Sequence, residues 1–239
     1  AASALGGRVF VAEAYLDPVD RLVRYVSPGR LHTTFNFDAL LSAWSAESQR
    51  IVIRRTLRAH AAVGAPATWV LGNHDNVRVA TRYGKDVTGI DFADENLHAV
   101  DPIKLGESMA SSPTDIALGR RRARAAVLLE LALPGGAYVY QGEELGLDEV
   151  EDLPDEVLQD PTWERSGHRV RGRDGCRVPL PWSGDAAPLG FGPGGEPWLP
   201  QPAHWADLTM ERQATDPTST LSLYRAALHT RRSLPAFRD

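Results

Sequence analysis

The sequence predicts an α/β fold in which helices cover a parallel sheet. Apolar strand-like segments alternate with helical segments four times along the 239 residues, and connected parallel strands need such crossovers. The composition, 43% apolar and 24% charged, is ordinary for a globular protein and provides enough apolar residues for a sizeable core. The length is also close to the roughly 250 residues of one complete (β/α)8 barrel.

Four segments have the β-branched, aromatic and small apolar residues that are typical of buried strands. The expected strands are residues 8–15 (RVFVAEAY), 33–37 (TTFNF), 67–72 (ATWVLG) and 136–140 (GAYVY). In the first of these, Val9, Val11 and Glu13 share one face because side chains alternate along a strand. We therefore expect Glu13 at the carboxyl end of a buried strand.

Each strand is followed, directly or after a long connection, by a segment with helical character. Residues 18–26 begin with Pro18, which is tolerated in a first helical turn. Residues 46–62 mix apolar and arginine positions, and residues 116–133 end at Pro134 and Gly135. Residues 217–232 place leucine and tyrosine side chains on one face, which predicts the last helix.

Two connections, residues 73–115 and 141–215, are unusually long. Both follow a strand and precede a helix, so they lie at the carboxyl edge of the sheet, where α/β proteins build their sites. Loops of this length in a compact domain are commonly functional. Residues 172–202 contain seven glycines and seven prolines, which excludes regular structure, but the interspersed Trp182, Phe191, Trp198 and the nearby Trp205 predict a packed loop.

Composition excludes several classes of protein. The net charge of −5 disfavours nucleic acid as a partner, because phosphates attract basic surfaces. The longest apolar runs are too short to span a membrane, and residues 1–7 lack the pattern of a signal peptide. The single cysteine, Cys176, cannot form an internal disulfide, which together with these features predicts a cytoplasmic protein without nucleic-acid or membrane partners.

Polar side chains follow two of the predicted strands. Glu13 could be a strand-end residue in a salt bridge, and Asn73-His74-Asp75 could be a simple turn, because Asn and Asp favour turns. A functional interpretation gains weight because two carboxylates would meet at one edge, with Arg78 nearby to bind hydroxyls or a developing charge. Paired carboxylates are typical of glycoside chemistry, and on this pattern alone Glu13 would be the acid and Asp75 the nucleophile.

The remaining polar clusters have simpler interpretations. Glu143 and Glu144 could extend the carboxylate group, but we favour a helix N-terminus where acidic residues complement the dipole. The arginines at 120, 121, 122 and 124 are expected on the solvated face of their helix. The histidines and Cys176 lack zinc-ligand spacing, and the sequence contains no phosphate-binding or nucleophile-elbow motif, so we expect no metal and no cofactor.

Five segments together resemble the α-amylase family of glycoside hydrolases (family 13), in particular bacterial α-glucosidases and oligo-1,6-glucosidases. They are VFVAEAY (9–15), FNFDALL (35–41), WVLGNHDNVR (69–78), YVYQGEELGL (138–147) and GRDGCRVPLPWSG (172–184). The resemblance implies that Glu13 is the general acid/base, that Asp75 stabilises the transition state, that His74 binds substrate hydroxyls and that Arg173 reaches the sugar site. Asp75 is then the third carboxylate rather than the nucleophile.

The same resemblance implies that the chain is not a complete barrel. The segments match barrel strands five to eight, with long loops after strands seven and eight, and no segment has the strand-four pattern that holds the family's nucleophilic aspartate. Residues 1–239 are therefore expected to be the C-terminal half of a (β/α)8 TIM barrel, a partial catalytic domain. The N-terminal half and the family's C-terminal β-domain would lie outside the chain.

These implications lead to one leading hypothesis and two alternatives. The leading hypothesis is a retaining, exo-acting α-glucosidase that releases glucose from short α-linked oligosaccharides, with this piece inactive alone. The first alternative is a transglucosylase or isomerase of the same family, which would pass the glucosyl group to a sugar instead of water. The second is a non-catalytic relative, against which the retained Glu13 and Asp75 count. No sequence feature indicates an oligomeric state.

Overall fold

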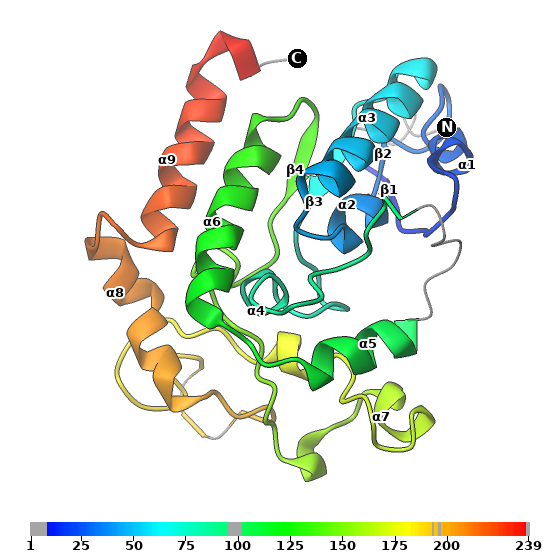
Figure 1. Cartoon of the computed structure of the whole chain (residues 1–239). Helices are drawn as coiled ribbons and strands as arrows, with labels where there is room; N and C mark the ends of the chain where they lie inside the picture. Colours follow the sequence, from blue (N-terminus) through cyan, green and yellow to red (C-terminus); the bar gives the residue numbers. More distant parts are fainter. Residues whose placement is uncertain (1–8, 95–101, 193, 196, 238–239) are drawn as a thin grey trace.

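The computed structural model describes residues 9–94, 102–192, 194–195 and 197–237, and it has the predicted α/β architecture with parallel strands (Figure 1). Strand β1 (Val11–Ala12) pairs with β2 (Thr33–Thr34), and β3 (Thr68–Val70) pairs with β4 (Gly136–Tyr138), both in parallel. The prediction of one continuous sheet is wrong for the described residues, because the strands form two separate pairs.

Side-chain hydrogen bonds connect the two strand pairs at the place where a continuous sheet would have backbone hydrogen bonds. The Asn36 amide donates to the carbonyl oxygen of Thr68 over 2.9 Å, and the Thr68 hydroxyl donates to the carbonyl oxygen of Thr34. Further along, the rings of Phe35 and Tyr138 lie 5.6 Å apart, so β2 and β4 approach each other at their carboxyl ends. The four strand ends therefore face a common region.

The three long helices begin and end where local chemistry dictates. Helix α3 (Ala46–Val63) starts at Ser45, whose side chain accepts from the amide of Ser48, and ends at Gly64 in the left-handed conformation (φ 67°). Helix α6 (Ile116–Ala132) is capped by Asp115 and stops before Pro134. Helix α9 (Thr220–Ser233) begins at Ser219 in the same way.

The first two predicted strands are shorter than expected. Residues 33–37 leave the strand after Thr34 because Asn36 caps helix α2 (Phe37–Leu41), which the sequence analysis missed. In the segment 8–15, residue 8 lies outside the described residues, and the prediction of burial is wrong: Val9 is 70% exposed and Val11 45% exposed. The physical reason is that β1 pairs with β2 along one edge only, and no other described strand covers it.

The predicted helix over residues 18–26 is observed as α1 (Val19–Leu22) followed by the 3₁₀ turn η2 (Val23–Tyr25). Short helices that the sequence did not predict lie in the connections. The long connections and the C-terminus contain α4 (Val79–Arg82), α5 (Pro102–Ser111), η3 (Asp155–Val157), α7 (Pro161–Arg165), η4 (Asp174–Arg177), η5 (Ala203–Leu208), α8 (Met210–Thr215) and η6 (Pro235–Phe237). Figure 1 shows both long connections below the strands, at the carboxyl ends of β3 and β4, as predicted.

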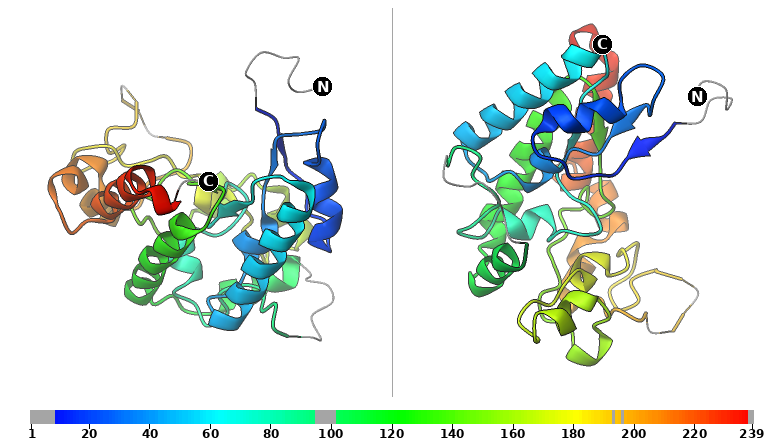
Figure 2. Two further views of the ribbon diagram at one scale, coloured as in Figure 1. Left: turned by 90° about the horizontal axis from the view of Figure 1, so that it is seen from above. Right: turned by 90° about the vertical axis from the view of Figure 1, so that its right-hand side faces the viewer.

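Helices α9, α6, α3 and α1 follow one another around one side of the strands when the molecule is seen from above (Figure 2, left). One apolar cluster joins β3, α4, α6 and α9, with Tyr83 and Val127 fully buried. Helix α6 crosses α4 closely at Gly119, where an added Cβ would run into the carbonyl oxygen of Ala80. The strands thus have a helical layer on one side.

A second apolar cluster forms within the long connection after β4. Trp205 is fully buried there, together with Leu147 and Val178, so the prediction of a packed loop is confirmed for this part. Trp182 and Trp198, by contrast, are 44% and 53% exposed. In the part of the chain that the structure describes, no helix is long and apolar enough to cross a membrane.

Candidate active site

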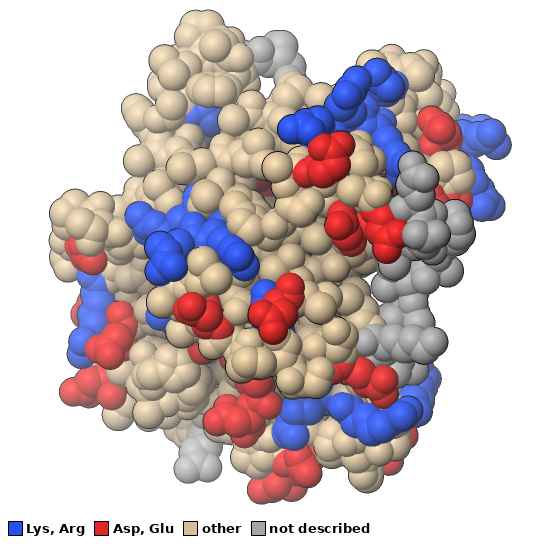
Figure 3. Space-filling view, in the orientation of Figure 1, with Lys and Arg blue, Asp and Glu red and all other residues tan. Residues whose placement is uncertain are grey.

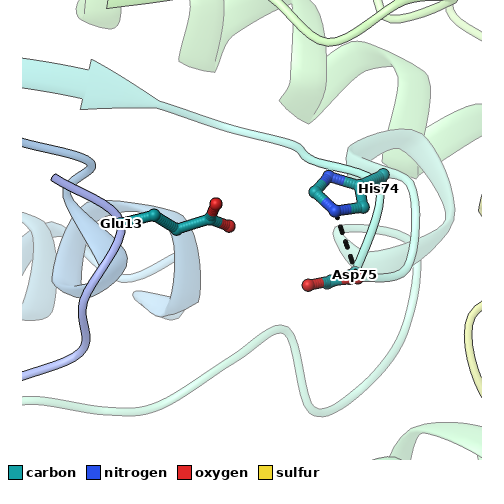
Figure 4. A group of neighbouring side chains, drawn as sticks. All are labelled: Glu13, His74 and Asp75. Carbon is teal, nitrogen blue, oxygen red and sulfur yellow. Dashed lines mark ion pairs between the residues drawn. The ribbon is translucent and has the colours of Figure 1, made fainter. Parts of the chain in front are cut away.

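Glu13, His74 and Asp75 meet at the carboxyl ends of two strands from different pairs. Glu13 follows β1 directly, and His74 and Asp75 lie in the turn after β3. Each of these side chains offers one atom that could bind a ligand, and the three atoms all lie within 4.8 Å of one another. The carboxylates of Glu13 and Asp75 point toward one another, and His74 Nε2 lies 3.5 Å from Asp75 Oδ1 (Figure 4). The predicted proximity of Glu13 and Asp75 is therefore observed.

Asn73 builds the turn that presents His74 and Asp75. Its side chain is buried, and its Oδ1 accepts from the backbone amide of Asp75 over 3.0 Å and from the Asn76 side chain over 2.8 Å. This is the bond pattern by which asparagine stabilises turns. The turn interpretation and the site interpretation of this motif are thus compatible, since the Asn73 turn holds the two side chains that face Glu13.

Two arginines at the ends of turn η4 bind the Asp75 carboxylate: Arg173 directly precedes the turn and Arg177 is its last residue. Arg173 Nη1 donates to Asp75 Oδ1 over 3.0 Å, and Arg177 Nη2 donates to the same oxygen over 2.8 Å. Arg177 Nε also donates to the carbonyl oxygen of His74 over 2.8 Å. Arg173 was among the predicted residues, but Arg177 was missed. The only available signal was its spacing of four residues from Arg173 within the segment GRDGCR.

A buried aspartate holds Arg173 from the other side. Asp160 is 4% exposed, and its Oδ2 accepts from the side-chain Nε and the backbone amide of Arg173. Burial by itself would raise the pKa of Asp160, but the bonds from Arg173 and Thr162 lower this pKa to about 2. The same contact raises the pKa of Arg173. Asp160 is thus an anion at neutral pH, and no motif in the sequence indicated its role.

Arg78, which was expected to bind substrate, lies apart from this group. The residue is 3% exposed, and its Nη1 and Nη2 each donate over 2.8 Å, to the carbonyl oxygens of Gln141 and Cys176. Its guanidinium also lies 5.3 Å from the ring centroid of Tyr140 and 5.7 Å from that of Trp205. In this arrangement Arg78 joins segments of the second long connection and is almost fully buried, so its contact with substrate stays a prediction.

Two glutamates in the loop after β4, the buried Glu143 and the half-buried Glu149, lie outside the group of Glu13, His74 and Asp75. Burial raises the pKa of Glu143 to about 7, although bonds from the Tyr224 hydroxyl and the Tyr140 amide oppose this rise. Burial likewise raises the pKa of Glu149 to about 7, opposed by the amide and the charge of Arg78. Residues 141–146 form turns, so the predicted helix N-terminus at Glu143 is wrong.

The basic cluster on α6 is largely bonded to the protein itself. Arg120 pairs with Asp148 over 2.9 Å, Arg122 donates to the carbonyl oxygen of Tyr83, and Arg124 donates to Thr220 Oγ1. Only Arg121 of this run is exposed. Figure 3 shows basic side chains gathered over this region with acidic ones scattered around them, so this face carries charges of both signs.

The atoms of Glu13, His74 and Asp75 lie close enough together to hold a metal ion. The charges around Asp75 oppose this use, because two guanidinium groups already bind its Oδ1. Two charged donors already occupy that oxygen, which leaves fewer lone pairs of Asp75 for a metal ion. The arrangement fits a group of carboxylates facing a neutral or transiently cationic ligand better than it fits a metal centre.

Comparison with known proteins identifies the chain at the level of the family. The model of the alpha amylase catalytic domain matches residues 108–239, more than half of the chain. A "Probable alpha-glucosidase" of Rhizobium meliloti (strain 1021) is 34% identical over 170 residues, which are 71% of this chain and 25% of that protein. Maltase A1 of Drosophila melanogaster is 29% identical over 243 residues, covering 97% of this chain and 35% of the relative.

A solved structure extends the similarity to nearly the whole chain. The crystal structure of an alpha-glucosyl transfer enzyme, XgtA, superposes with a TM-score of 0.75 at 32% sequence identity. The superposition covers 99% of this chain and 38% of that enzyme. The chain thus spans about a quarter to a third of the curated relatives, at 25%, 31% and 35% of their lengths.

Proposed function

The chain belongs to the α-amylase family, and from this membership and the site geometry we propose that it is part of a retaining α-glucosidase that releases glucose from short α-linked oligosaccharides. The observation that carries the proposal is the meeting of Glu13, His74 and Asp75 within 4.8 Å. The retaining mechanism is proposed from membership of the family, because the spacing that separates retaining from inverting glycosidases is that between the acid/base and the nucleophile, and Asp75 is not the nucleophile here.

Glu13 is proposed as the general acid/base. In the first step it protonates the glycosidic oxygen, and in the second it takes a proton from the attacking water. Asp75 carries the negative charge that stabilises the cationic sugar of the transition state, and its two arginines hold it in one orientation. His74 and Arg173 are proposed to bind sugar hydroxyls at the same place.

The charges of the site favour an uncharged sugar over a phosphorylated one. The guanidinium groups of Arg173 and Arg177 are already bonded to the carboxylates of Asp160 and Asp75, and a third carboxylate, that of Glu13, lies near Asp75. A phosphate group would need uncommitted positive charge, which these five side chains do not provide. We therefore propose a neutral α-glucoside as the substrate class.

We also propose that residues 1–239 form the C-terminal half of a (β/α)8 barrel, strands five to eight. The support is the order of the motifs, the parallel pairing of the four strands, and the exposed apolar residues Val9 and Val11 on the open side of β1. Another parallel strand would cover such an edge. The nucleophilic aspartate would then come from upstream residues, so the isolated chain is expected to be inactive.

A transglucosylase is the second candidate, favoured by the 32% identity to an alpha-glucosyl transfer enzyme. Both reactions would use the same carboxylates and differ in the acceptor, water or a sugar. Product analysis in the presence of excess maltose separates the two, because transfer yields longer saccharides whereas hydrolysis yields glucose. A non-catalytic relative is disfavoured by the facing carboxylates of Glu13 and Asp75.

The test uses the complete gene product that contains this chain, assayed for release of p-nitrophenol from p-nitrophenyl α-glucoside. We expect Glu13→Gln and Asp75→Asn each to lower kcat by on the order of 10²–10⁴-fold, the scale of general-acid and electrostatic contributions. Glu164→Gln is the matched control, because Glu164 is exposed on α7 and, among the described residues, forms its ion pair with the exposed His168. Residues 1–239 alone should release no p-nitrophenol.

Two results would overturn the proposal. Near-normal turnover in Glu13→Gln or Asp75→Asn would refute the roles assigned to these residues. Activity of residues 1–239 alone that disappears in Glu13→Gln would refute the half-barrel assignment, because the chain would then supply its own nucleophile.

A further inference from the structure

We infer that Asp160 and Arg177 are positioning residues that together fix the orientation of the Asp75 carboxylate. This inference rests on the proposed function, in which Asp75 stabilises the transition state. The four side chains form one continuous chain of contacts in the order Asp160, Arg173, Asp75, Arg177. Neither end of that chain contacts Glu13, so both would act through Asp75.

The two arginines leave one oxygen of Asp75 available. Both guanidinium groups donate to Oδ1, at 3.0 and 2.8 Å, and no hydrogen bond to Oδ2 occurs among the described residues. Figure 4 shows the carboxylate turned with an oxygen toward Glu13. Two donors on the same oxygen oppose rotation of the carboxyl group, because rotation would break both charge-assisted bonds. Oδ2 is thereby held for the ligand.

Each arginine has a second anchor, which fixes the plane of its guanidinium group. Arg173 uses Nε for Asp160 and Nη1 for Asp75, whereas Arg177 uses Nε for the carbonyl oxygen of His74 and Nη2 for Asp75. A planar group bonded through two edges has one orientation, a property that lysine lacks. Arg177 therefore connects the Asp75 side chain to the backbone of the turn that contains His74 and Asp75.

Turn η4, which follows Arg173 directly and ends with Arg177, is itself held at both ends. At its C-terminal end, the carbonyl oxygen of Cys176 accepts from Arg78 Nη2 and from the Tyr140 hydroxyl, over 2.8 and 2.9 Å. At its N-terminal end, Asp174 is 1% exposed and accepts from the amides of Gln159 and Asp160. Arg173 and Arg177 therefore start from a fixed backbone, as preorganised donors require.

Asp160 has two functions that a single substitution can separate. Its Oδ1 accepts from the amide of Thr162 over 2.8 Å and caps helix α7, while its Oδ2 carries the charge that binds Arg173. Asparagine caps helices as well as aspartate does but has no charge. Asp160→Asn should therefore keep α7 and weaken the hold on Arg173.

The kinetic test uses the complete gene product and an aryl α-glucoside. We expect Asp160→Asn and Arg177→Lys each to lower kcat/KM by on the order of 10–100-fold, the equivalent of one charge-assisted hydrogen bond. Most of the loss should appear in kcat, because Asp75 acts on the transition state. Arg177→Ala should lose more than Arg177→Lys, which keeps the charge. The matched controls are Asp152→Asn and Arg165→Lys, both at exposed positions in the same connection.

A second readout does not depend on activity. In protein labelled with ¹⁵N-arginine, Arg173 should give an Nε–H resonance that exchanges slowly with solvent and disappears in Arg173→Lys. We expect Asp160→Asn to accelerate this exchange at least tenfold and Asp152→Asn to leave it unchanged. Unchanged exchange in Asp160→Asn, or unchanged kcat in both Asp160→Asn and Arg177→Lys, would overturn the inference. An unmodified protein that is inactive on α-glucosides but shows the expected exchange would refute the proposed function and retain the contact chain.

Discussion

Arg78 offers a direct choice between a ligand-binding role and a structural role. The sequence places it three residues after Asp75, as a candidate for substrate contact, whereas the structure buries it against two backbone carbonyls and two rings. The informative substitution is Arg78→Met, which keeps an unbranched stem and removes the charge and the five donors. A structural role predicts loss of stability, whereas a ligand role predicts loss of affinity.

The expected loss of stability follows from the contacts. The carbonyl oxygen of Cys176 retains the Tyr140 hydroxyl after the substitution, and that of Gln141 belongs to an exposed residue and can bind water. Each lost bond to a charged donor contributes about 1.5–3 kcal/mol, and these two replacement partners reduce the cost toward the lower end. The contacts with the aromatic rings add about 0.5–2 kcal/mol. We therefore expect Arg78→Met to lower the free energy of unfolding by about 3.5–5 kcal/mol.

Urea unfolding of the complete gene product, followed by tryptophan fluorescence, measures this loss. Trp205 is fully buried and lies against the Arg78 guanidinium, so it reports on the affected region. Arg165→Met is the control, because Arg165 is exposed on α7 and should change stability by less than about 0.5 kcal/mol. An Arg78→Met protein with an unchanged midpoint and a raised KM would refute the structural role and restore the expectation from the sequence.

Two further predictions concern buried groups. Glu143 and Glu149 have pKa values near 7 in the folded protein and near 4.5 when unfolded, so the folded state binds more protons between these values. The stability that these groups contribute is present below pH 4.5 and is lost as the pH rises through 7. Glu143→Gln should therefore reduce the slope of melting temperature against pH between these values. An unchanged slope would contradict this prediction. Gly119→Ala should lower stability by about 1–3 kcal/mol in urea unfolding, because the added methyl group meets Ala80 across the α4–α6 contact; a gain, as at a free helical position, would be the contrary result.

The elements that were predictable are those that local chemistry determines. Helix α3 was expected over residues 46–62 and observed as Ala46–Val63, and α6 was expected over 116–133 and observed as Ile116–Ala132. Both have a capping side chain before the first turn and glycine or proline after the last. Sequence reasoning succeeds there because a cap and a stop act on their neighbours in the chain.

Burial of β1 could not be predicted in this way. The alternation of Val9, Val11 and Glu13 is that of a strand, but exposure depends on which other strands lie beside it. Short helices such as α2 and α4 were missed for a related reason. Helix α4 has only four residues, too few for a periodic pattern, and its position follows from packing against α6 at Gly119.

The residues of the candidate site also differ in whether local sequence determines their role. Glu13 and Asp75 were found because each follows a strand and the carboxyl ends of parallel strands lie at one edge. Arg177 and Asp160 were missed because their roles depend on contacts between distant segments: Arg177 follows Asp75 by 102 residues, and Asp160 reaches the site only through Arg173.

The long loop after β4 therefore has a structural role: it fixes the position of Asp75. Glu13 and Asp75 end strands of two different pairs, which are joined mainly through Asn36 and Thr68, so no continuous ladder fixes the distance between the two carboxylates. Rigid placement of Asp75 must then come from the side of the loop, through charged groups with more than one anchor. If this is correct, loosening the loop at Asp160 should disturb the site more than an equal loss of stability elsewhere in the fold.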